Sequence, residues 1–302
     1  MAAKTATKST TKDAADAAGA SVAKPVQTRT ASTKSAVKPA AKVPAKPAAK
    51  PAAKPASAAA MAPEPAVAEP AAAPRKAGKG GLYDQATAEA ERIGAPARKA
   101  GAGYVLHEYP SYQTYVEVQT AGNKAKLRRQ YVKRSHVDRL AAWLGERGHP
   151  VKAGICHGTR AGREQKWFRR ALRCSGIFGT EISDTATEFP FTVQWDFHDV
   201  NPDWVGKHDF VYSNSWDHAF DPKRAFTSWL GQLRKGGVLL VDYTAGQAPA
   251  AANALDPFGI EIAPLQEMLA EVGRAAGAEP AGVLDFTDNP EYRARVVVMR
   301  KL

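Results

Sequence analysis

The first 80 residues contain no Leu, Ile, Phe, Trp or Tyr, and the first such side chains are Leu82 and Tyr83. A segment without large apolar side chains cannot bury enough surface to offset the entropy lost on ordering, so we expect residues 1–80 to be a disordered, low-complexity tail. The remainder of the 302 residues is long enough for one domain with a hydrophobic core. This division excludes a chain built from two equal folded domains.

The tail also carries most of the net positive charge. It has 14 Lys and Arg against 4 Asp and Glu, whereas residues 81–302 have 28 against 26. Between Lys34 and Lys54 a Lys-Pro-Ala-Ala theme recurs, which forbids a continuous helix and favours extended chain. This composition resembles the tails of histone H1 and of bacterial histone-like proteins. Two roles stay open for residues 1–80: non-specific binding to nucleic acid through counterion release, and a solubilising linker.

Cysteine usage and the N-terminus favour a cytoplasmic protein. Cys156 and Cys174 form no CxxC pair, which excludes a disulfide framework and a zinc motif. The opening residues MAAKTATKST lack the apolar segment of a secretory signal, and the apolar run at 238–241 is too short to cross a membrane. An organellar transit peptide is the alternative, because the tail is rich in Ser, Thr and Ala.

Residues 151–302 alternate short apolar runs with helical stretches and end in two strands. This order indicates an α/β fold, a doubly wound and mostly parallel sheet covered on both faces. Ligands of such sheets bind at the carboxyl ends of the strands. We expect strands at 151–155, 176–180, 191–196, 209–213, 237–243, 282–286 and 294–300, and helices at 162–173, 222–233 and 261–276.

Residues 81–150 read as a helical or irregular extension before that domain. We expect a helix over 83–99 that ends near Gly94, irregular structure or a strand at 104–119, and one continuous helix over 124–144. Seven Lys and Arg lie within 124–139, either as a solvated face or as a surface for an anionic acceptor such as a nucleic acid or a phosphorylated glycan.

Residues that can contact a ligand lie at or after the ends of the first three expected strands. Gly154 and Gly158 allow the backbone to turn tightly and approach a ligand ahead of a helix N-terminus. Glu181, after the second strand, can accept hydrogen bonds from a ribose diol. Asp196 is followed by Phe197, and such a pair can hold an adenine by its amine and its ring face.

The stretch from 151 to 243 resembles the class I S-adenosylmethionine (SAM)-dependent methyltransferases. The segment HDFVYSNSWDHAFDPKRAFTSWLGQLRKGGVLLVDY, residues 208–243, is similar to the family's fourth and fifth strands with the helix between them, and the last two strands match its terminal antiparallel hairpin. The resemblance covers residues 151–302. It implies a Rossmann-like sheet of seven strands, SAM across the tips of the first strands, and transfer of a methyl group to an acceptor that the sequence does not identify.

The family's first loop reads acid-x-Gly-x-Gly-x-Gly. We align it so that Lys152 replaces the acid and Cys156 the middle glycine. These departures leave a second function open, a catalytically impaired methyltransferase-like scaffold that residues 1–80 tether to nucleic acid. The resemblance implies the following cofactor-binding residues: Gly154, Cys156, Gly158, Glu181, Ile182, Asp196, Phe197, Ser213 and Asn214.

Methyl transfer to an oxygen acceptor also needs a base. His218 lies just beyond the fourth strand and has a suitable unperturbed pKa, and Asp217 can orient it or the substrate. The alternative is that both residues cap the helix that follows. We predict no metal, because the histidines and aspartates near the strand tips lack metal-ligand spacing.

Overall fold

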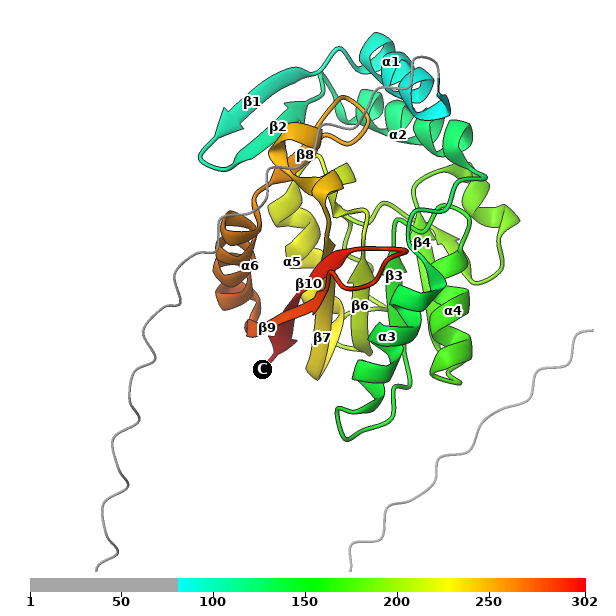
Figure 1. Ribbon diagram of the computed structural model, residues 1–302, viewed down its shortest axis with the longest axis vertical. Coiled ribbons are helices and arrows are strands. Elements are labelled where there is room, and N and C mark those ends of the chain that lie inside the picture. Colours follow the sequence, from blue (N-terminus) through cyan, green and yellow to red (C-terminus); the bar gives the residue numbers. More distant parts are fainter. Residues whose placement is uncertain (1–80) are drawn as a thin grey trace, which may run out of the picture. The chain divides into compact units, whose positions relative to one another are not determined.

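A computed structural model of the protein describes residues 81–302 (Figure 1). The predictions of a disordered tail and of nucleic-acid binding by that tail fall on residues 1–80, outside the described residues. The larger sheet consists of β3 (Gly154–His157), β4 (Ile177–Glu181), β5 (Thr192–Gln194), β6 (His208–Ser213), β7 (Leu233–Tyr243), β9 (Ala278–Phe286) and β10 (Ala294–Lys301).

The order of these strands confirms the predicted fold class. It is β5-β4-β3-β6-β7-β10-β9, and β10 alone runs antiparallel to its neighbours, pairing with both β7 and β9. The sheet is therefore doubly wound and mostly parallel, with a closing antiparallel hairpin.

Helices cover both faces of this sheet, which explains why its strands are apolar throughout. Successive side chains of a strand point to opposite faces. Val211 and Leu239 belong to the core under two helices, whereas Phe210 and Leu240 belong to the core under the other two. The first pair of helices is α5 (Pro222–Gln232) and α6 (Ile262–Ala276), and the second is α3 (Arg134–Gly145) and α4 (Arg163–Ala171).

A second layer of structure lies over the carboxyl ends of the parallel strands (Figure 1). It contains α1 (Leu82–Gly94) packed on α2 (Tyr112–Lys126), and a small antiparallel sheet of β1 (Ala97–Gly101), β2 (Tyr104–Glu108) and β8 (Phe258–Ile260). Sequence analysis missed this sheet, because β8 pairs with β2 from a distant part of the chain. Short 3-10 turns are η1 (Asp184–Glu188), η2 (Trp216–His218), η3 (Ala245–Gln247) and η4 (Pro249–Ala251).

The expectation for 104–119 is wrong in its second half. Only β2 is extended, and α2 begins at Tyr112 after Ser111, whose hydroxyl accepts a hydrogen bond from the Thr114 amide at 3.1 Å. This side chain satisfies one of the amides that a helix start leaves without a partner.

The expectation of one helix over 124–144 is also wrong. α2 ends at Lys126, and α3 begins only at Arg134. The connecting residues include no Gly or Pro, so the local sequence does not mark the break. At the end of α2 the buried Lys126 ammonium lies 3.7 Å from the carboxylate of Asp256. Within residues 81–302, no helix is both long and apolar enough to cross a bilayer.

Candidate functional site

Two hollows open at the carboxyl edge of the large sheet, where the strand order reverses. β3 lies between β4, which follows it in the chain, and β6 on its other side, and ligands of doubly wound sheets bind at such a reversal. The first hollow, which we call the strand-tip pocket, holds about 470 Å³ of empty space, part of it open to solvent. Its lining consists of Tyr115, Gln119, Gly122, Asn123, Lys126, Gly158, Arg160, Glu181, Ile182, Asp196, Phe197, Ser215, His218 and Leu255.

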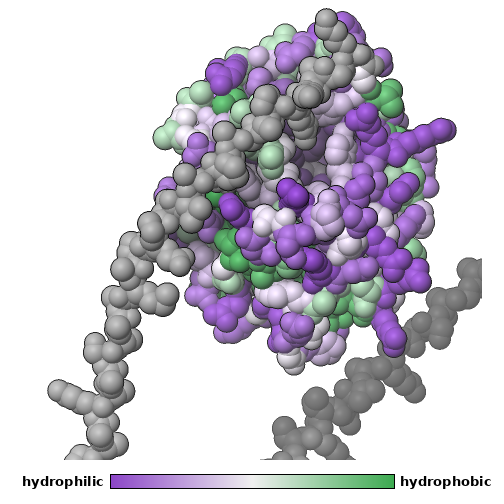
Figure 2. Space-filling model, viewed as in Figure 1, coloured by the Kyte–Doolittle hydropathy of each residue, from purple (hydrophilic) through white to green (hydrophobic). Residues whose placement is uncertain are grey.

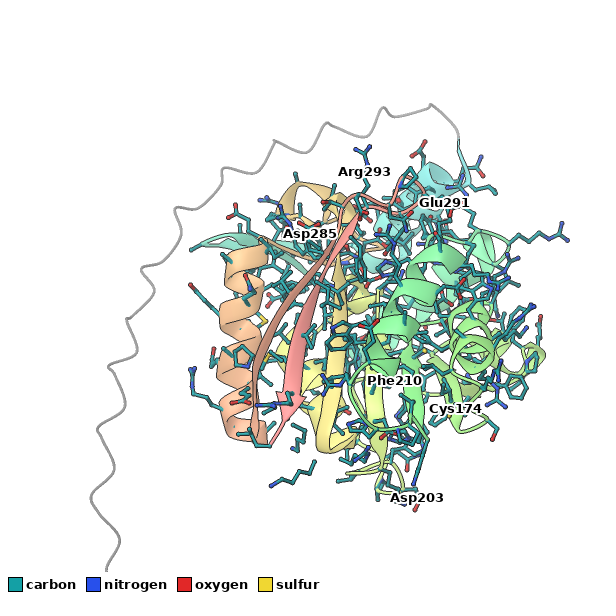
Figure 3. All side chains as sticks on the ribbon, turned by 60° about the horizontal axis from the view of Figure 1, so that its bottom comes forward. Cys174, Asp203, Phe210, Asp285, Glu291 and Arg293 are labelled. Atoms are coloured by element: carbon teal, nitrogen blue, oxygen red, sulfur yellow. The ribbon has the colours of Figure 1, made fainter. Side chains whose placement is uncertain are left out.

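The second hollow, the outer pocket, is larger and holds about 1790 Å³ on the same basis. It shares Lys126, Arg160, Ser215 and His218 with the strand-tip pocket, so the two hollows adjoin. Its further lining includes Tyr83, Tyr131, Asn214, Asp217, Thr244, Gln247, Asn253, Asp256, Glu291, Tyr292 and Arg293. Figure 3 shows Glu291 and Arg293 on the loop between β9 and β10.

The structure places Gly154 and Cys156 inside β3, not in the loop after it. A Cβ at Gly154 would overlap the ring of Phe210, so this glycine makes room for a core side chain. Cys156 is fully buried in the core under α3 and α4. Lys152 precedes the strand, and its amide donates to the Asp209 carboxylate at 2.7 Å. The loop assignment of Gly154 and Cys156 is therefore wrong, and neither residue lines either of the two hollows.

The loop at the tip of β3 runs from Gly158 to Gly162. Gly158, Arg160 and Gly162 all have left-handed backbone angles, with φ of 69°, 45° and 65°. The acid-x-Gly-x-Gly-x-Gly pattern thus begins four residues later than the sequence alignment put it. Cys156 takes the place of the acid, and Arg160 that of the middle glycine, at a conformational cost of roughly 1–2 kcal/mol.

Glu181 ends β4 and is nearly buried in the strand-tip pocket, beside Ile182. Its carboxylate accepts hydrogen bonds from the amides of Arg160 at 2.9 Å and Ser183 at 3.2 Å. Burial raises the pKa of Glu181 above its usual value, against the opposing effect of these bonds. The bond to Arg160 joins this carboxylate to the loop after β3.

Asp196 follows β5 and lines the same pocket with Phe197. Its Oδ1 accepts from the ring Nδ1 of His198 at 2.7 Å, and its Oδ2 accepts from the hydroxyl of Tyr112 at 2.8 Å. Burial acts to raise the pKa of Asp196, but these hydrogen bonds outweigh it and hold the pKa below the usual value. Asp196 is therefore ionised at neutral pH.

Of the two residues predicted at the tip of β6, one faces a pocket. Ser213 is fully buried, donates to the carbonyl of His157 at 3.2 Å and lines neither hollow. Asn214 lines the outer pocket, and its carbonyl accepts from the side-chain amide of Gln247 at 2.8 Å.

His218 lies on η2, where the two hollows adjoin. Its Nδ1 is 2.8 Å from Oε1 of Gln119, whose amide nitrogen donates to the carbonyl of Leu255 at 3.0 Å. Since the Leu255 carbonyl only accepts, the Gln119 amide is oriented, and the hydrogen-bond network assigns the proton of neutral His218 to Nδ1. The lone pair is left on Nε2, which lies 3.5 Å from Oδ1 of Asp256.

Burial lowers the pKa of His218 to about 4, against the opposing effect of the Asp256 charge. The imidazole is therefore neutral at pH 7 and can accept a proton at Nε2. The Asp256 carboxylate would then stabilise the imidazolium. Asp217, the predicted partner, lines the outer pocket, but the carboxylate that faces Nε2 belongs to Asp256.

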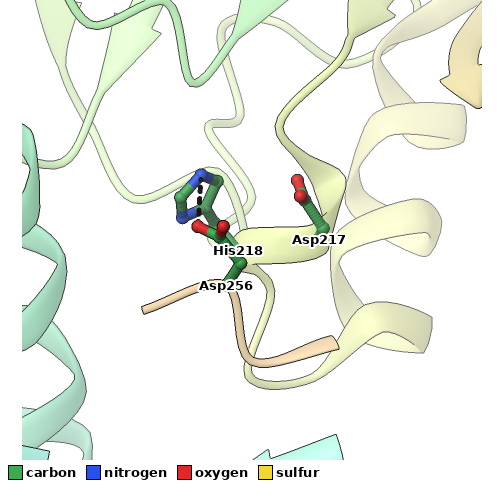
Figure 4. Close-up of side chains that lie close together, drawn as sticks. All are labelled: Asp217, His218 and Asp256. Carbon is green, nitrogen blue, oxygen red and sulfur yellow. Dashed lines mark ion pairs between the residues drawn. The ribbon is translucent and has the colours of Figure 1, made fainter. Parts of the chain in front are cut away.

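Asp217, His218 and Asp256 gather in one cluster, shown in Figure 4, and each offers an atom that could hold a metal ion within 4.8 Å of the others. Lys126 already brings a positive charge to 3.7 Å from Asp256, and the hydroxyl of Tyr83 donates to the same carboxylate at 2.6 Å. We therefore assign no metal to the cluster, and the expected absence of a metal stays a prediction.

No family model matches the chain, and neither does any curated protein. Among solved structures it is similar to 1,6-didemethyltoxoflavin-N1-methyltransferase of Burkholderia thailandensis, with 15% identity over 68% of this chain and 98% of that one and a TM-score of 0.47. It is also similar to the N-methyltransferase NodS of Bradyrhizobium japonicum, with 11% identity over 61% and 98% and a TM-score of 0.45. A third is magnesium protoporphyrin IX methyltransferase of Synechocystis, with 15% identity over 62% and 84% and a TM-score of 0.40.

The strand order and the single antiparallel strand decide the fold. The chain has the class I methyltransferase fold. The resemblance identified from the sequence is thereby confirmed at the level of the fold.

The strand-tip pocket offers polar groups and apolar surface of the kinds that bind a nucleoside. The Nδ2 atom of Asn123 is buried there without a hydrogen-bond partner among the described residues, and such a donor is costly unless a ligand accepts from it. Two carboxylates, Glu181 and Asp196, can accept from a diol and an amine. Ile182 and Phe197 offer apolar surface for a flat ring.

Sequence reasoning missed the residues that cover these pockets from above. Gln119, Asn123 and Lys126 come from α2, part of which was expected to be irregular. Asp256 comes from the segment before β8, which carries no recognisable motif. The sequence carries no signal for Gln119, Asn123 or Asp256, and it marks Lys126 only as one of the seven cations within 124–139.

Proposed function

We propose that this protein transfers a methyl group from SAM to an acceptor oxygen. The observation that carries the proposal is the position of His218, a neutral imidazole where the strand-tip pocket adjoins the larger outer pocket. The strand-tip pocket would hold the cofactor, and the outer pocket the acceptor. The two pockets share Lys126, Arg160 and Ser215 as well.

The cofactor would be held by residues of the strand tips. Glu181 and Asn123 would bind the ribose, and Asp196 and Phe197 the adenine. When bound, SAM supplies an electrophilic methyl group. Positioning and exclusion of water contribute much of the rate of such transfers, and side chains of α1 and α2 line the pockets together with the strand tips.

The acceptor would be activated by His218. An acceptor hydroxyl that loses its proton as the new oxygen–carbon bond forms can pass that proton to Nε2. The Asp256 carboxylate, 3.5 Å away, would balance the resulting charge. Gln119 would keep Nε2 directed at the pocket by accepting from Nδ1.

One observation favours the second function, a binding scaffold held on nucleic acid by residues 1–80. Both carboxylate oxygens of Asp196 already accept hydrogen bonds from Tyr112 and His198. A carboxylate that already accepts hydrogen bonds within the chain contributes less binding free energy when an adenine amine also donates to it. The two functions differ in whether the strand-tip pocket binds a cofactor.

Calorimetry of the full chain with S-adenosylhomocysteine tests the proposal. We expect saturable binding that Glu181→Gln weakens roughly 10–100-fold, since a hydrogen bond to a charged group contributes about 1.5–3 kcal/mol. Glu188→Gln, at the exposed end of η1, is the matched control and should leave the affinity unchanged. No binding at millimolar ligand would contradict methyl transfer and favour the scaffold.

A further inference from the structure

Positive charge is concentrated on one flank of the described part of the chain. Residues 128–173 contain 13 Lys and Arg against 3 Asp and Glu, whereas the other residues of 81–302 contain 15 against 23. This segment builds α3, β3, α4 and the loop before α3. α3 packs against α4 on the right of Figure 1, and Figure 2 shows that flank to be strongly hydrophilic.

The outer face of α4 carries a row of cations. Arg163, Lys166 and Arg170 are spaced by three and four residues and so share one face of the helix, and Arg173 follows two residues after its end. The row spans roughly 15 Å at 1.5 Å per residue. None of the four makes an ion pair with another residue of 81–302, and like charges at this spacing cost helix stability. Arg170 in the last turn complements the helix dipole, but Arg163 in the first turn opposes it, so the stability of α4 does not account for the whole row.

A second group of cations adjoins the row from the loop between α2 and α3. The Gln130 amide of this loop donates to Glu164 of α4 at 2.6 Å, and the Arg160 guanidinium donates to the Arg129 carbonyl at 3.1 Å. These bonds hold the loop against the start of α4. We call the combined surface the basic flank, and it consists of Arg128, Arg129, Lys133, Arg163, Lys166, Arg170 and Arg173.

We propose that the basic flank binds the phosphate backbone of a nucleic acid. Five of its seven cations are arginines, whose planar guanidinium matches a phosphate with two parallel hydrogen bonds. A membrane surface would call for apolar side chains that insert among the lipids. No large apolar side chain within residues 127–173 is exposed, and the exposed ring of Phe191 beside α4 is covered on one face by the guanidinium of Arg169, 3.7 Å from the ring centre. The row along α4 is suited to successive phosphates and reads no base sequence.

This proposal goes beyond methyl transfer, because it requires neither cofactor nor acceptor. It also differs from binding by residues 1–80, since it assigns a surface to the folded part. In the full chain both segments would contribute, the tail with its 14 Lys and Arg and the flank with a fixed array.

Fluorescence anisotropy with a labelled 30-base-pair DNA duplex, and with a single-stranded RNA of equal length, tests the proposal on the full chain. The dissociation constant is measured at several KCl concentrations. We expect Arg163→Glu/Arg170→Glu/Arg173→Glu to weaken binding at least tenfold. We also expect it to reduce the slope of log affinity against log salt by roughly two to three, at about 0.9 per phosphate contact on duplex DNA.

The matched control is Lys207→Glu/Lys235→Glu/Arg274→Glu, which changes the net charge equally at exposed positions outside the flank. Its slope should stay close to that of the parent, because the basic flank and residues 1–80 are both intact in the control. Circular dichroism checks folding, and Arg163→Gln/Arg170→Gln provides a milder version. Equal losses of nucleic-acid affinity in the flank and control variants would overturn the proposal. Binding to phosphatidylserine vesicles that depends on the flank, without binding to either nucleic acid, would also overturn it.

Discussion

His218 is held by side chains that the linear sequence keeps far apart. Gln119, which binds its Nδ1, lies 99 residues earlier, and Asp256 approaches its Nε2 from the segment before β8. Gln119 fixes the tautomer of the imidazole, and Asp256 places a negative charge beside the nitrogen that would accept a proton. The basicity of this imidazole is therefore set by the tertiary structure and not by its neighbours in the chain.

Replacing Lys126 should raise the pKa of His218. Burial is the main cause of the depressed value of about 4, and the charge of Lys126 lowers it further. Because Lys126 is almost fully buried, solvent does not screen its charge, and Lys126→Met should raise the pKa by about one unit. Nitrogen-15 NMR titration of the imidazole measures this value and also reports whether the neutral form carries its proton on Nδ1.

Lys124→Met is the control for that change. Lys124 lies on the same helix end but is exposed, paired with Asp184. Its removal should leave the His218 pKa where it is. A His218 pKa that does not move in Lys126→Met would show that the ammonium does not act on the imidazole.

The strand-end residues that line the strand-tip pocket could be predicted from the sequence, but the residues that line it from α2 could not. Glu181 and Asp196 were found because each follows an apolar run, and the ends of parallel strands meet at one edge of a sheet. Gln119 and Lys126 face the pocket from a helix, where a polar side chain is usually exposed to solvent. Only the packing of α2 over the sheet gives them a role.

At the scale of elements, one glycine explains the misplaced loop. Gly154 indicates a turn when it is read locally, and the strand was therefore expected to end at residue 155. In the structure it lies inside β3, where the missing Cβ admits the ring of Phe210. The strand order was predictable because it depends on the alternation of whole elements, whereas the register of β3 depends on one packing contact.

Gly154→Ala should destabilise the fold by about 1–3 kcal/mol, because the added methyl group overlaps the Phe210 ring in a closely packed core. Urea unfolding measures the change. The double variant with Phe210→Leu should recover part of the loss, as expected for two residues in contact.

Gly231→Ala is the opposite case. Gly231 lies in α5 with nothing within 4 Å of an added Cβ, so the substitution should leave the free energy of unfolding unchanged or raise it by up to about 1 kcal/mol. If Gly154→Ala unfolded at the same urea concentration as the parent, the proposed reason for this glycine would be wrong.

At the scale of the whole molecule, the buried histidines make a contribution to stability that acid removes. Burial lowers the pKa of four histidines, His107, His157, His208 and His218. The pKa falls to about 3 for His157 and to about 4 for His218, from a usual value of 6.5. Since these histidines bind more protons in the unfolded chain between these values, their contribution to the free energy of unfolding falls as the pH drops below 6.5.

Lowering the pH from 7.5 to 5.0 should therefore cost about 2 kcal/mol for each of His157 and His218, at 1.36 kcal/mol per pKa unit. Urea unfolding at the two pH values measures the loss. His157→Gln can keep hydrogen bonds to Thr180 and Gln232 and should reduce the loss by about 2 kcal/mol. An equal loss in the parent and the variant would mean that His157 is not the group that titrates.

The pairing of β2 with β8 has a consequence for how the chain can be divided. Residues 104–106 pair with residues 258–260, and the exposed turn near Gly148 lies between these two segments in the sequence. A backbone break at that turn would leave this pairing and the contacts of α3 with α4 in place. Folding would then become a bimolecular reaction between two fragments, and the apparent stability of the pocket would depend on protein concentration.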